Sequence, residues 1–472
     1  MFLYFYYLAI QQLVKPVLGS VYSNMHLYSN HILGSYLNEP VIYCEAWFWI
    51  CFGVIGLLPR LFIKINYTAS IVLYALSFSV IKLSSFAILE GNENPHYLAG
   101  LQFIVMYCAC ICTSYNILVY IVSLLAIIYS ISIPIHIPAQ IMLYFCAIVS
   151  IVHYNKRYLI ALVVLDASIW YNVQQSLDLS DFEFLFSSWH NNDFIQVIER
   201  KSWDLRIQRA QHSIIGAMYP KYHDSAFKAF YVPDALVLTR TSLTNTNCLI
   251  IGLGVGISTR SMVDYGLQVT VVELNPKVVQ TAQTYFDLPK SITITIADGA
   301  NYIKQISKYD FIIHDVFSDG IVPGQLYSQS FLDNILANLK INGLLVINFV
   351  GDTSHKAFHM FVNTLKSKFT NLRCFGEELQ EKQIITENCF CFASLYPIEF
   401  RSGTLKDANN HPIRHQVFND LLSTEINLNA IPQCQLITNE SISLFEYYSR
   451  LSYKDFWTAM QKMMPAKVWI QS

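Results

Sequence analysis

Hydrophobic positions follow two different patterns along this chain, and the change falls near residue 172. In the first part, nearly continuous apolar runs are separated by short polar or proline-containing breaks, and they cover 42–58, 68–89, 98–114, 117–133 and 139–153, with a further hydrophobic element at 1–19. A helix that spans a bilayer needs about 20 apolar residues, and about 17 are tolerated. The pattern predicts an N-terminal multi-span α-helical membrane region.

The second part alternates short β-branched runs with helical stretches. Predicted strands are Cys248–Ile251, Val269–Val272, Ile292–Ile296, Phe311–His314 and Leu344–Asn348, with closing strands at Leu372–Phe375 and Phe390–Ser394. Predicted helices between them are Ser258–Tyr265, Pro276–Tyr285 and Ser330–Leu339. Apolar strands that alternate with helices are typical of a sheet that is buried on both faces. The sequence therefore predicts an α/β Rossmann-like domain with a mostly parallel sheet.

These patterns divide the chain into four parts. Residues 1–172 are the predicted transmembrane helical region, and 173–240 form a small β-rich segment with expected strands at Phe194–Glu199 and Ile207–Ser213. The Rossmann-like domain is expected over 241–400 and a C-terminal extension over 401–472, of which the aromatic stretch Tyr447–Met463 is expected to pack onto the domain.

The composition supports a chain with one part in lipid and the other in water. Hydrophobic residues make up 53% of the 472 residues and charged residues 14%, against about 25% charged in soluble proteins. The formal net charge of −2 argues against a nucleic-acid partner, which needs a surplus of Lys and Arg. Cysteine spacings such as that of Cys389 and Cys391 do not suit a tetrahedral zinc site. We therefore interpret them as buried thiols and expect no metal.

Basic residues set the expected orientation. One basic loop holds Arg60 and Lys64, another holds Lys156 and Arg157, and four predicted spans lie between them. Lys and Arg favour the cytoplasmic side. We expect an integral protein of an endomembrane with the second half in the cytoplasm, provided that the short segment 158–170 stays interfacial. The sequons that begin at Asn66 and Asn439 give a check on this topology.

Candidate chemistry gathers where predicted strands end. The first strand runs into the glycine turn Gly252, Gly254 and Gly256 and then into a helix. Such turns let a ligand approach the backbone, and helix N-termini offer unpaired N–H groups. Acids close the next three strands, namely Glu273, Asp298 and Asp315. Because ligands bind outside the carboxyl ends of parallel strands, we expect these acids to line one crevice. Asp298, which precedes Gly299, also fits a simple turn or helix cap.

The stretch from Cys248 to Asn348, with IIGLGVGIST, VVELNP, ADGANYI, HDVFSDGIVP and GLLVINF, resembles the spermidine/spermine synthase family. This family shares the fold of S-adenosylmethionine-dependent methyltransferases. Its members move an aminopropyl group from decarboxylated S-adenosylmethionine to a polyamine. A membrane segment ahead of such a domain resembles a fungal subgroup of the family. The resemblance implies S-adenosylmethionine or its decarboxylated form as co-substrate, a small-molecule amine as acceptor, and a possible homodimer.

The resemblance also implies residue roles. The glycine turn would hold the methionine-derived tail, Glu273 the ribose, and Asp298 with Gly299 the adenine amine. Asp315 falls on the catalytic aspartate that deprotonates the attacking amine. His212 would border the substrate, and Ser318 with Asp319 would stand in the family's DSSD pattern.

Several positions depart from that pattern. Val255 replaces the usual acid in the glycine turn, Ser318 replaces the fourth residue of DSSD, and Gln211 stands before the histidine. The sequence thus leaves three readings open: a membrane-anchored aminopropyltransferase, a methyltransferase that acts on a substrate drawn from the membrane, and a non-catalytic nucleoside-binding protein. A nicotinamide dehydrogenase fits less well, because the turn is GxGxG and lacks the GxGxxG spacing.

Overall fold

The computed structural model describes residues 180–190, 193–210, 213–317, 322–376 and 386–452, together with Met464 and Val468. The predicted membrane region therefore lies outside the described residues, and its spans stay predictions. Within the described ranges, no helix combines the length and the apolar character needed to cross a bilayer. The described sheets and helices fall within one compact unit, residues 182–190 and 195–460, apart from the first two residues of one strand.

A small five-stranded sheet comes first in the chain. Its strands lie in sequence order, and they are β1 (Phe182–His190), β2 (Asp193–Arg200), β3 (Leu205–Ala210), β4 (Ser213–Tyr219) and β5 (Asp224–Ser225). The sequence had predicted a single strand at Ile207–Ser213, and this was wrong. β3 ends at Ala210 and β4 begins at Ser213, and these two residues are paired partners in antiparallel strands. The sequence between them lacks the Gly, Asn and Asp residues that usually signal the end of a strand, so the pattern gave no warning.

The second sheet has seven strands in the order β11-β12-β10-β9-β6-β7-β8. Five of them run parallel: β6 (Asn247–Ile251), β7 (Gln268–Glu273), β8 (Thr293–Ile296), β9 (Tyr309–His314) and β10 (Leu339–Asp352). The closing strands are β11 (Asn371–Phe375) and β12 (Thr386–Ser394), and β12 pairs antiparallel with both β10 and β11. The expected α/β domain with a mostly parallel sheet is confirmed, with β10 much longer than predicted.

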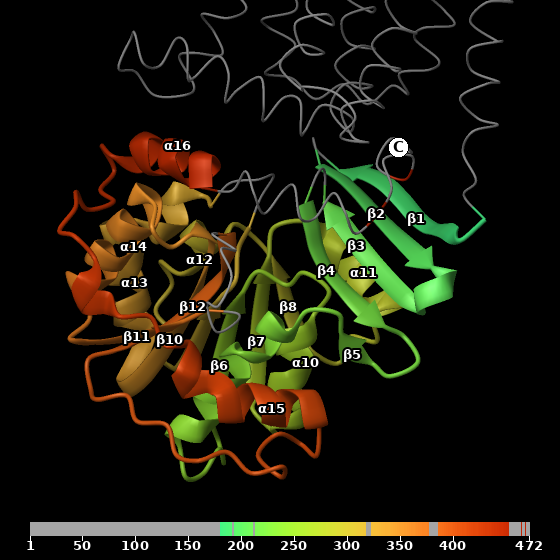
Figure 1. The fold of residues 1–472 in the computed structure, drawn as a ribbon, viewed down its shortest axis with the longest axis horizontal. Coiled ribbons are helices and arrows are strands. Elements are labelled where there is room, and N and C mark those ends of the chain that lie inside the picture. The colour runs from blue at the N-terminus through green and yellow to red at the C-terminus, as the bar shows by residue number, and fades with distance from the viewer. Residues whose placement is uncertain are drawn as a thin grey trace, which may run out of the picture. The chain divides into compact units, whose positions relative to one another are not determined.

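Helices cover both faces of this sheet (Figure 1). Alternate residues of each central strand point to opposite sides, so Leu249 and Ile251 join one core cluster while Cys248 and Ile250 join the other. The first cluster takes in α13 (Gln329–Asn338) and α14 (Lys356–Lys366), and the second takes in α10 (Ile257–Asp264) and α11 (Pro276–Tyr285). This two-sided burial explains why the strands read as continuous apolar runs.

The C-terminal extension packs onto the domain through two of its helices, whereas most of the aromatic stretch expected to do so, Tyr447–Met463, lies outside the described residues. In α16 (Ile442–Ser452), Phe445 is fully buried in the first cluster. In α15 (Pro412–Asp420), the guanidinium of Arg414 lies 2.8 Å from the carboxylate of Asp234. Asp234 has no exposed surface, and burial raises the pKa of its carboxyl to about 6. A buried ion pair therefore attaches the extension to the short helix η5 (Pro233–Thr239).

We predict that Arg414→Ala lowers the free energy of unfolding by about 3–5 kcal/mol at neutral pH, because it leaves a buried carboxylate without its counterion. Urea denaturation of the full chain measures this loss. Lys368→Ala is the control, since its partner Asp333 is largely exposed and such pairs contribute about 1 kcal/mol or less. Equal effects of the two substitutions would contradict the role of Arg414 as the counterion of a buried carboxylate.

Candidate functional site

Backbone hydrogen bonds bring the ends of four parallel strands to one edge of the large sheet. The amide of Gly252 donates to the carbonyl of Val272 at 2.9 Å, and that of Asp315 donates to the carbonyl of Ile251 at 3.0 Å. The amide of Ala297, the residue before Asp298, donates to the carbonyl of Glu273 at 3.0 Å. Glu273, Asp298 and Asp315 therefore share the edge that the sequence predicted for them, at the point where the strand order reverses around β6.

The glycine turn between β6 and α10 requires its glycines. Gly252, Gly254 and Gly256 have φ angles of 91°, 53° and 82°, which side chains rarely adopt. A Cβ on Gly252 would lie 2.1 Å from the carbonyl oxygen of Asp315, and one on Gly254 would lie 2.9 Å from the carbonyl oxygen of Ile215. The turn is therefore packed between β9 and β4, and it leads directly into the N-terminus of α10.

Glu273 connects the second strand to this turn. One carboxylate oxygen accepts a hydrogen bond from the amide of Leu253 at 2.9 Å, and the other accepts from the amide of Asn275 at 2.8 Å. The half-buried side chain thus fixes the glycine turn at the end of β7. A carboxylate oxygen has two lone pairs, so these bonds are compatible with ribose hydroxyls as additional donors.

Asp298 is a helix cap in this structure. Its carboxylate accepts from the amide of Ala300 at 2.8 Å and from the side-chain amide of Asn301 at 3.1 Å, at the start of α12 (Gly299–Tyr302). A Cβ on Gly299 would lie 2.6 Å from a methyl of Ile251, so α12 packs closely on β6. The helix cap, which was one of the two roles that the sequence allowed for Asp298, is therefore present. The predicted contact with adenine would be an additional role of this carboxylate.

Asp315 has the most distinctive electrostatic setting of the three acids. Burial raises the pKa of its carboxyl, while a hydrogen bond from the side-chain amide of Asn348 opposes that rise. The donor nitrogen of Asn348 lies 2.9 Å from the carboxylate oxygen. A carboxylate with a raised pKa accepts a proton more readily at neutral pH, so this position suits a general base.

Sequence reasoning missed Asn348. This residue lies in the middle of β10, is 3% exposed, and donates to both Asp315 and the side-chain oxygen of Asn388 on β12. Its own side-chain oxygen is buried without a hydrogen-bond partner. The signal was available, because a single amide interrupts the apolar run LLVINFV, and a buried amide needs partners.

Aromatic packing supports the part of the sheet that holds Asp315 and Asn348. Tyr327 donates its hydroxyl hydrogen bond to the carbonyl of Asn348 at 2.7 Å and stacks edge-on against His314 at 4.9 Å. Burial lowers the pKa of His314 to about 3. His314 is therefore neutral at physiological pH and serves as a packing residue next to Asp315.

The glycine turn also carries the departure at Val255. This side chain is 4% exposed, and its methyl group lies 2.5 Å from where a Cβ on Gly216 of β4 would stand. Its neighbours are apolar, namely Val197, Met218, Tyr231, Ile257 and Phe286. Val255 is thus a packing residue of the junction with the small sheet.

His212, Ser318 and Asp319 lie outside the described residues, as does Gln211. Their roles stay predictions.

Residues 236–370 match the family model described as spermine/spermidine synthase domain. An N-terminal histidine N-methyltransferase of Emericella nidulans is 27% identical over 311 residues, covering 58% of this chain and 56% of the relative. A probable polyamine aminopropyl transferase of Bifidobacterium longum is 26% identical and covers 39% of this chain and 44% of the relative. The chain thus spans about half the length of these relatives.

Among solved structures, a probable spermidine synthase from Corynebacterium glutamicum is similar with a TM-score of 0.41 and 17% identity. The match covers 48% of the present chain and 84% of the Corynebacterium glutamicum chain.

We predict that Gly252→Ala destabilises the protein by more than the roughly 1–2 kcal/mol that a left-handed residue costs by itself, because the new methyl would meet the Asp315 carbonyl. Gly266→Ala is the matched control, since Gly266 has a φ of 80° and open space around its Cβ position. Urea denaturation compares the two variants. Equal losses would show that the close approach at Gly252 is unimportant.

Proposed function

We propose that this chain, through its spermine/spermidine synthase domain, binds S-adenosylmethionine or its decarboxylated form and transfers an alkyl group from the sulfonium to a nitrogen acceptor. Asp315 carries the proposal. Its backbone carbonyl packs against the glycine turn at the carboxyl edge of the sheet, and the pKa of its carboxyl is raised by burial and moderated by Asn348. That combination suits proton abstraction from an attacking nitrogen.

The reaction needs one base and no metal. The lone pair of the acceptor nitrogen attacks the carbon bound to sulfur, and the carbon–sulfur electron pair returns to sulfur, which becomes a neutral thioether. The proton that passes to Asp315 comes from the attacking nitrogen of an amine, or from the other ring nitrogen of a neutral imidazole, whose attacking nitrogen carries none. Binding both reactants side by side in the correct orientation lowers the barrier of the reaction. The glycine turn and Glu273 would position the sulfonium ligand, and Asp315 would orient and deprotonate the acceptor.

We favour methyl transfer from intact S-adenosylmethionine. The histidine N-methyltransferase aligns with more of this chain than the aminopropyl transferase does, and several acids that would bind a polyamine are replaced here, as at Val255 and Ser318. An imidazole, with a pKa near 6.5, is mostly neutral at pH 7, whereas an alkylammonium has a pKa of about 10.4. A histidine nitrogen therefore needs less help from the base.

Aminopropyl transfer from decarboxylated S-adenosylmethionine to a polyamine is the second candidate. The match of residues 236–370 to the spermine/spermidine synthase domain favours it. We also propose that residues 1–172 anchor the domain to an endomembrane, which would supply the lipid bilayer as a partner. The apolar runs of the sequence support that anchoring.

One experiment separates these functions. The full chain in detergent is incubated with S-adenosylmethionine carrying a labelled methyl group and a peptide that begins with histidine. We expect label in this peptide and little in the same peptide with alanine in place of the histidine. Product from decarboxylated S-adenosylmethionine and putrescine would instead support the second candidate. Absence of both products would contradict the proposal.

We predict that Asp315→Asn slows turnover about 10²–10⁴-fold, the usual contribution of a general base, and leaves S-adenosylmethionine affinity within a few-fold. Single-turnover kinetics and calorimetry measure the two effects. Asp310→Asn is the control, because Asp310 lies near the start of the same strand and pairs with Lys340. Unchanged turnover in the Asp315 variant would remove its role as base.

We predict that Asn348→Ala moves the acid limb of the kcat/KM profile to higher pH. The lost hydrogen bond lowers the pKa of Asp315 in the native chain, so its removal raises that pKa and leaves more of the base protonated at a given pH. A profile from pH 5 to 9 measures the shift. A limb that stays in place, or that moves toward lower pH, would contradict the coupling.

A further inference from the structure

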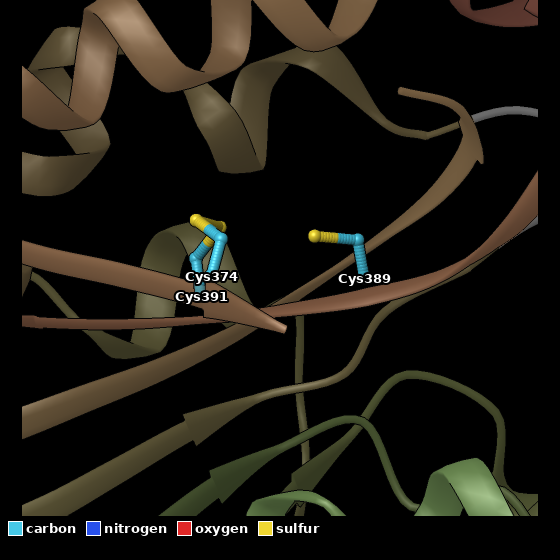
Figure 2. Close-up of side chains that lie close together, drawn as sticks. All are labelled: Cys374, Cys389 and Cys391. Carbon is cyan, nitrogen blue, oxygen red and sulfur yellow. A yellow bond between two sulfur atoms is a disulfide. The ribbon is translucent and has the colours of Figure 1, made fainter. Parts of the chain in front are cut away.

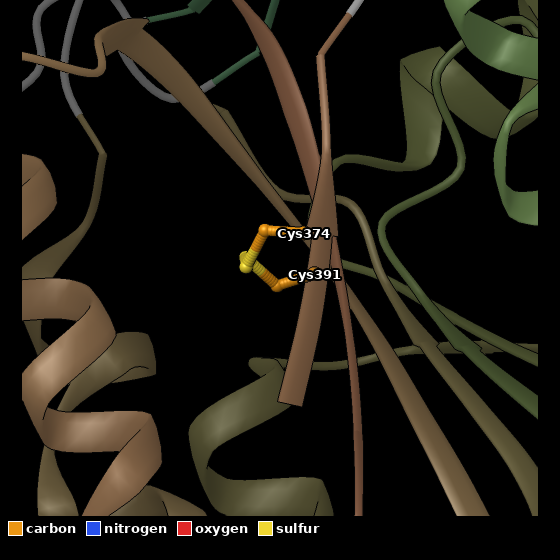
Figure 3. Close-up of a disulfide and its surroundings, with 2 residues drawn as sticks. All are labelled: Cys374 and Cys391. Atoms are coloured by element: carbon orange, nitrogen blue, oxygen red, sulfur yellow. A yellow bond between two sulfur atoms is a disulfide. The ribbon is translucent and has the colours of Figure 1, made fainter. Parts of the chain in front are cut away.

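Three cysteine sulfurs meet inside the closing strands of the large sheet. Cys374 on β11 and Cys391 on β12 stand directly opposite each other and form a disulfide (Figure 3). Cys389, two positions earlier on β12, points its thiol toward them (Figure 2), and the three sulfurs lie within 4.8 Å of one another. The sequence had indicated buried thiols here. Cys389 is one, but Cys391 is bonded, because the register of β11 and β12 brings Cys374 to it.

Because this disulfide is buried, it indicates the cellular compartment in which the chain folds. All three cysteines have no exposed surface and belong to the core cluster that includes α14. Oxidants reach such a site during folding, before the helix covers the sheet. Disulfides form and persist in oxidising compartments, whereas cytosolic thiols are kept reduced. The bond therefore points to folding outside the cytosol.

A second, independent feature lies in the C-terminal extension. The sequon Asn439-Glu440-Ser441 occupies the turn before α16, and Asn439 and Glu440 are exposed. The side-chain oxygen of Asn439 accepts a hydrogen bond from Ser330 at 3.1 Å, so the amide nitrogen, which is the atom that carries a glycan, takes no part in that bond. Asparagine-linked glycans occur on surface loops of proteins that pass through the secretory route.

The buried Ser441 hydroxyl indicates that glycosylation of the sequon precedes folding of the turn. It is 2% exposed and donates to the carbonyl of Leu436 at 2.7 Å. A glycosylating enzyme must read this hydroxyl, so the sequon would be modified before the turn closes, while the chain is entering the lumen.

We infer that the domain carrying Asp315 folds in the oxidising lumen of a secretory compartment and bears an N-linked oligosaccharide on Asn439. The disulfide and the sequon lie in different elements and support the same side of the membrane. The inference reverses the cytoplasmic orientation predicted from the basic loops. It does not depend on the proposed transferase activity.

The glycan is tested on the full chain expressed in yeast, with Asn66→Gln as background so that a single sequon remains. Treatment with an endoglycosidase should increase the electrophoretic mobility of this protein. Asn439→Gln and Ser441→Ala should abolish the shift, while Ser441→Thr, which preserves the sequon, should retain it. Asn429→Gln, at an exposed asparagine outside any sequon, is the matched control. A background protein without the shift would overturn the inference.

The disulfide is tested on the same protein. Cells are lysed in acid and denaturant, thiols are blocked with a maleimide, and thiols released by a reductant are then labelled with a heavy maleimide. We expect two labelled cysteines in the peptides that contain Cys374 and Cys391, and none there in the Cys374→Ser, Cys391→Ser double variant. Complete blocking of both cysteines before reduction would overturn the inference.

Discussion

The close approach of β6 and β9 at Gly252 is the constraint on which the site depends. The carbonyl of Asp315 occupies the space where any side chain on Gly252 would stand, and the amide of Asp315 donates back to Ile251. The end of one strand therefore fixes the path of the other. Without this contact the glycine turn could not lie against the backbone of Asp315, and the edge would lose the juxtaposition that makes it a candidate transferase site.

A balance of burial and hydrogen bonding sets the chemistry at that edge. Burial alone would push the Asp315 carboxyl toward its neutral form, whereas the Asn348 amide stabilises the ionised form. Asn348 is itself held through its backbone carbonyl by Tyr327 and through its side chain by Asn388. The base is thus controlled from β10 and β12, through Asn348 and Asn388, which both follow it by more than thirty residues in the sequence.

Much of this arrangement follows from local sequence. The β-branched runs give the positions of the parallel strands, and the acids that close them lie at one edge because parallel strands end together. Asn348 could have been found as a lone amide in an apolar strand. By contrast, the cap formed by Asp298 competes with its predicted ligand contact, and sequence cannot choose between two roles for one carboxylate.

Other features depend on long-range register and could not be predicted. The Cys374–Cys391 disulfide requires β11 and β12 to pair in one particular alignment, although neither cysteine has a spacing that signals it. The length of β10 likewise comes from its pairing with β9 and β12, since its first residues are too polar to read as a strand. In each case the partner strand supplies the information.

Hydrogen exchange of the full chain with and without S-adenosylmethionine tests the central claim most directly. An adenosyl group bound at this edge should slow exchange of the amides in the glycine turn, residues 252–257, and at the start of α12, residues 298–301. The small sheet's outer strand β1 should be unaffected. Protection confined to other elements, or none at saturating ligand, would contradict the account.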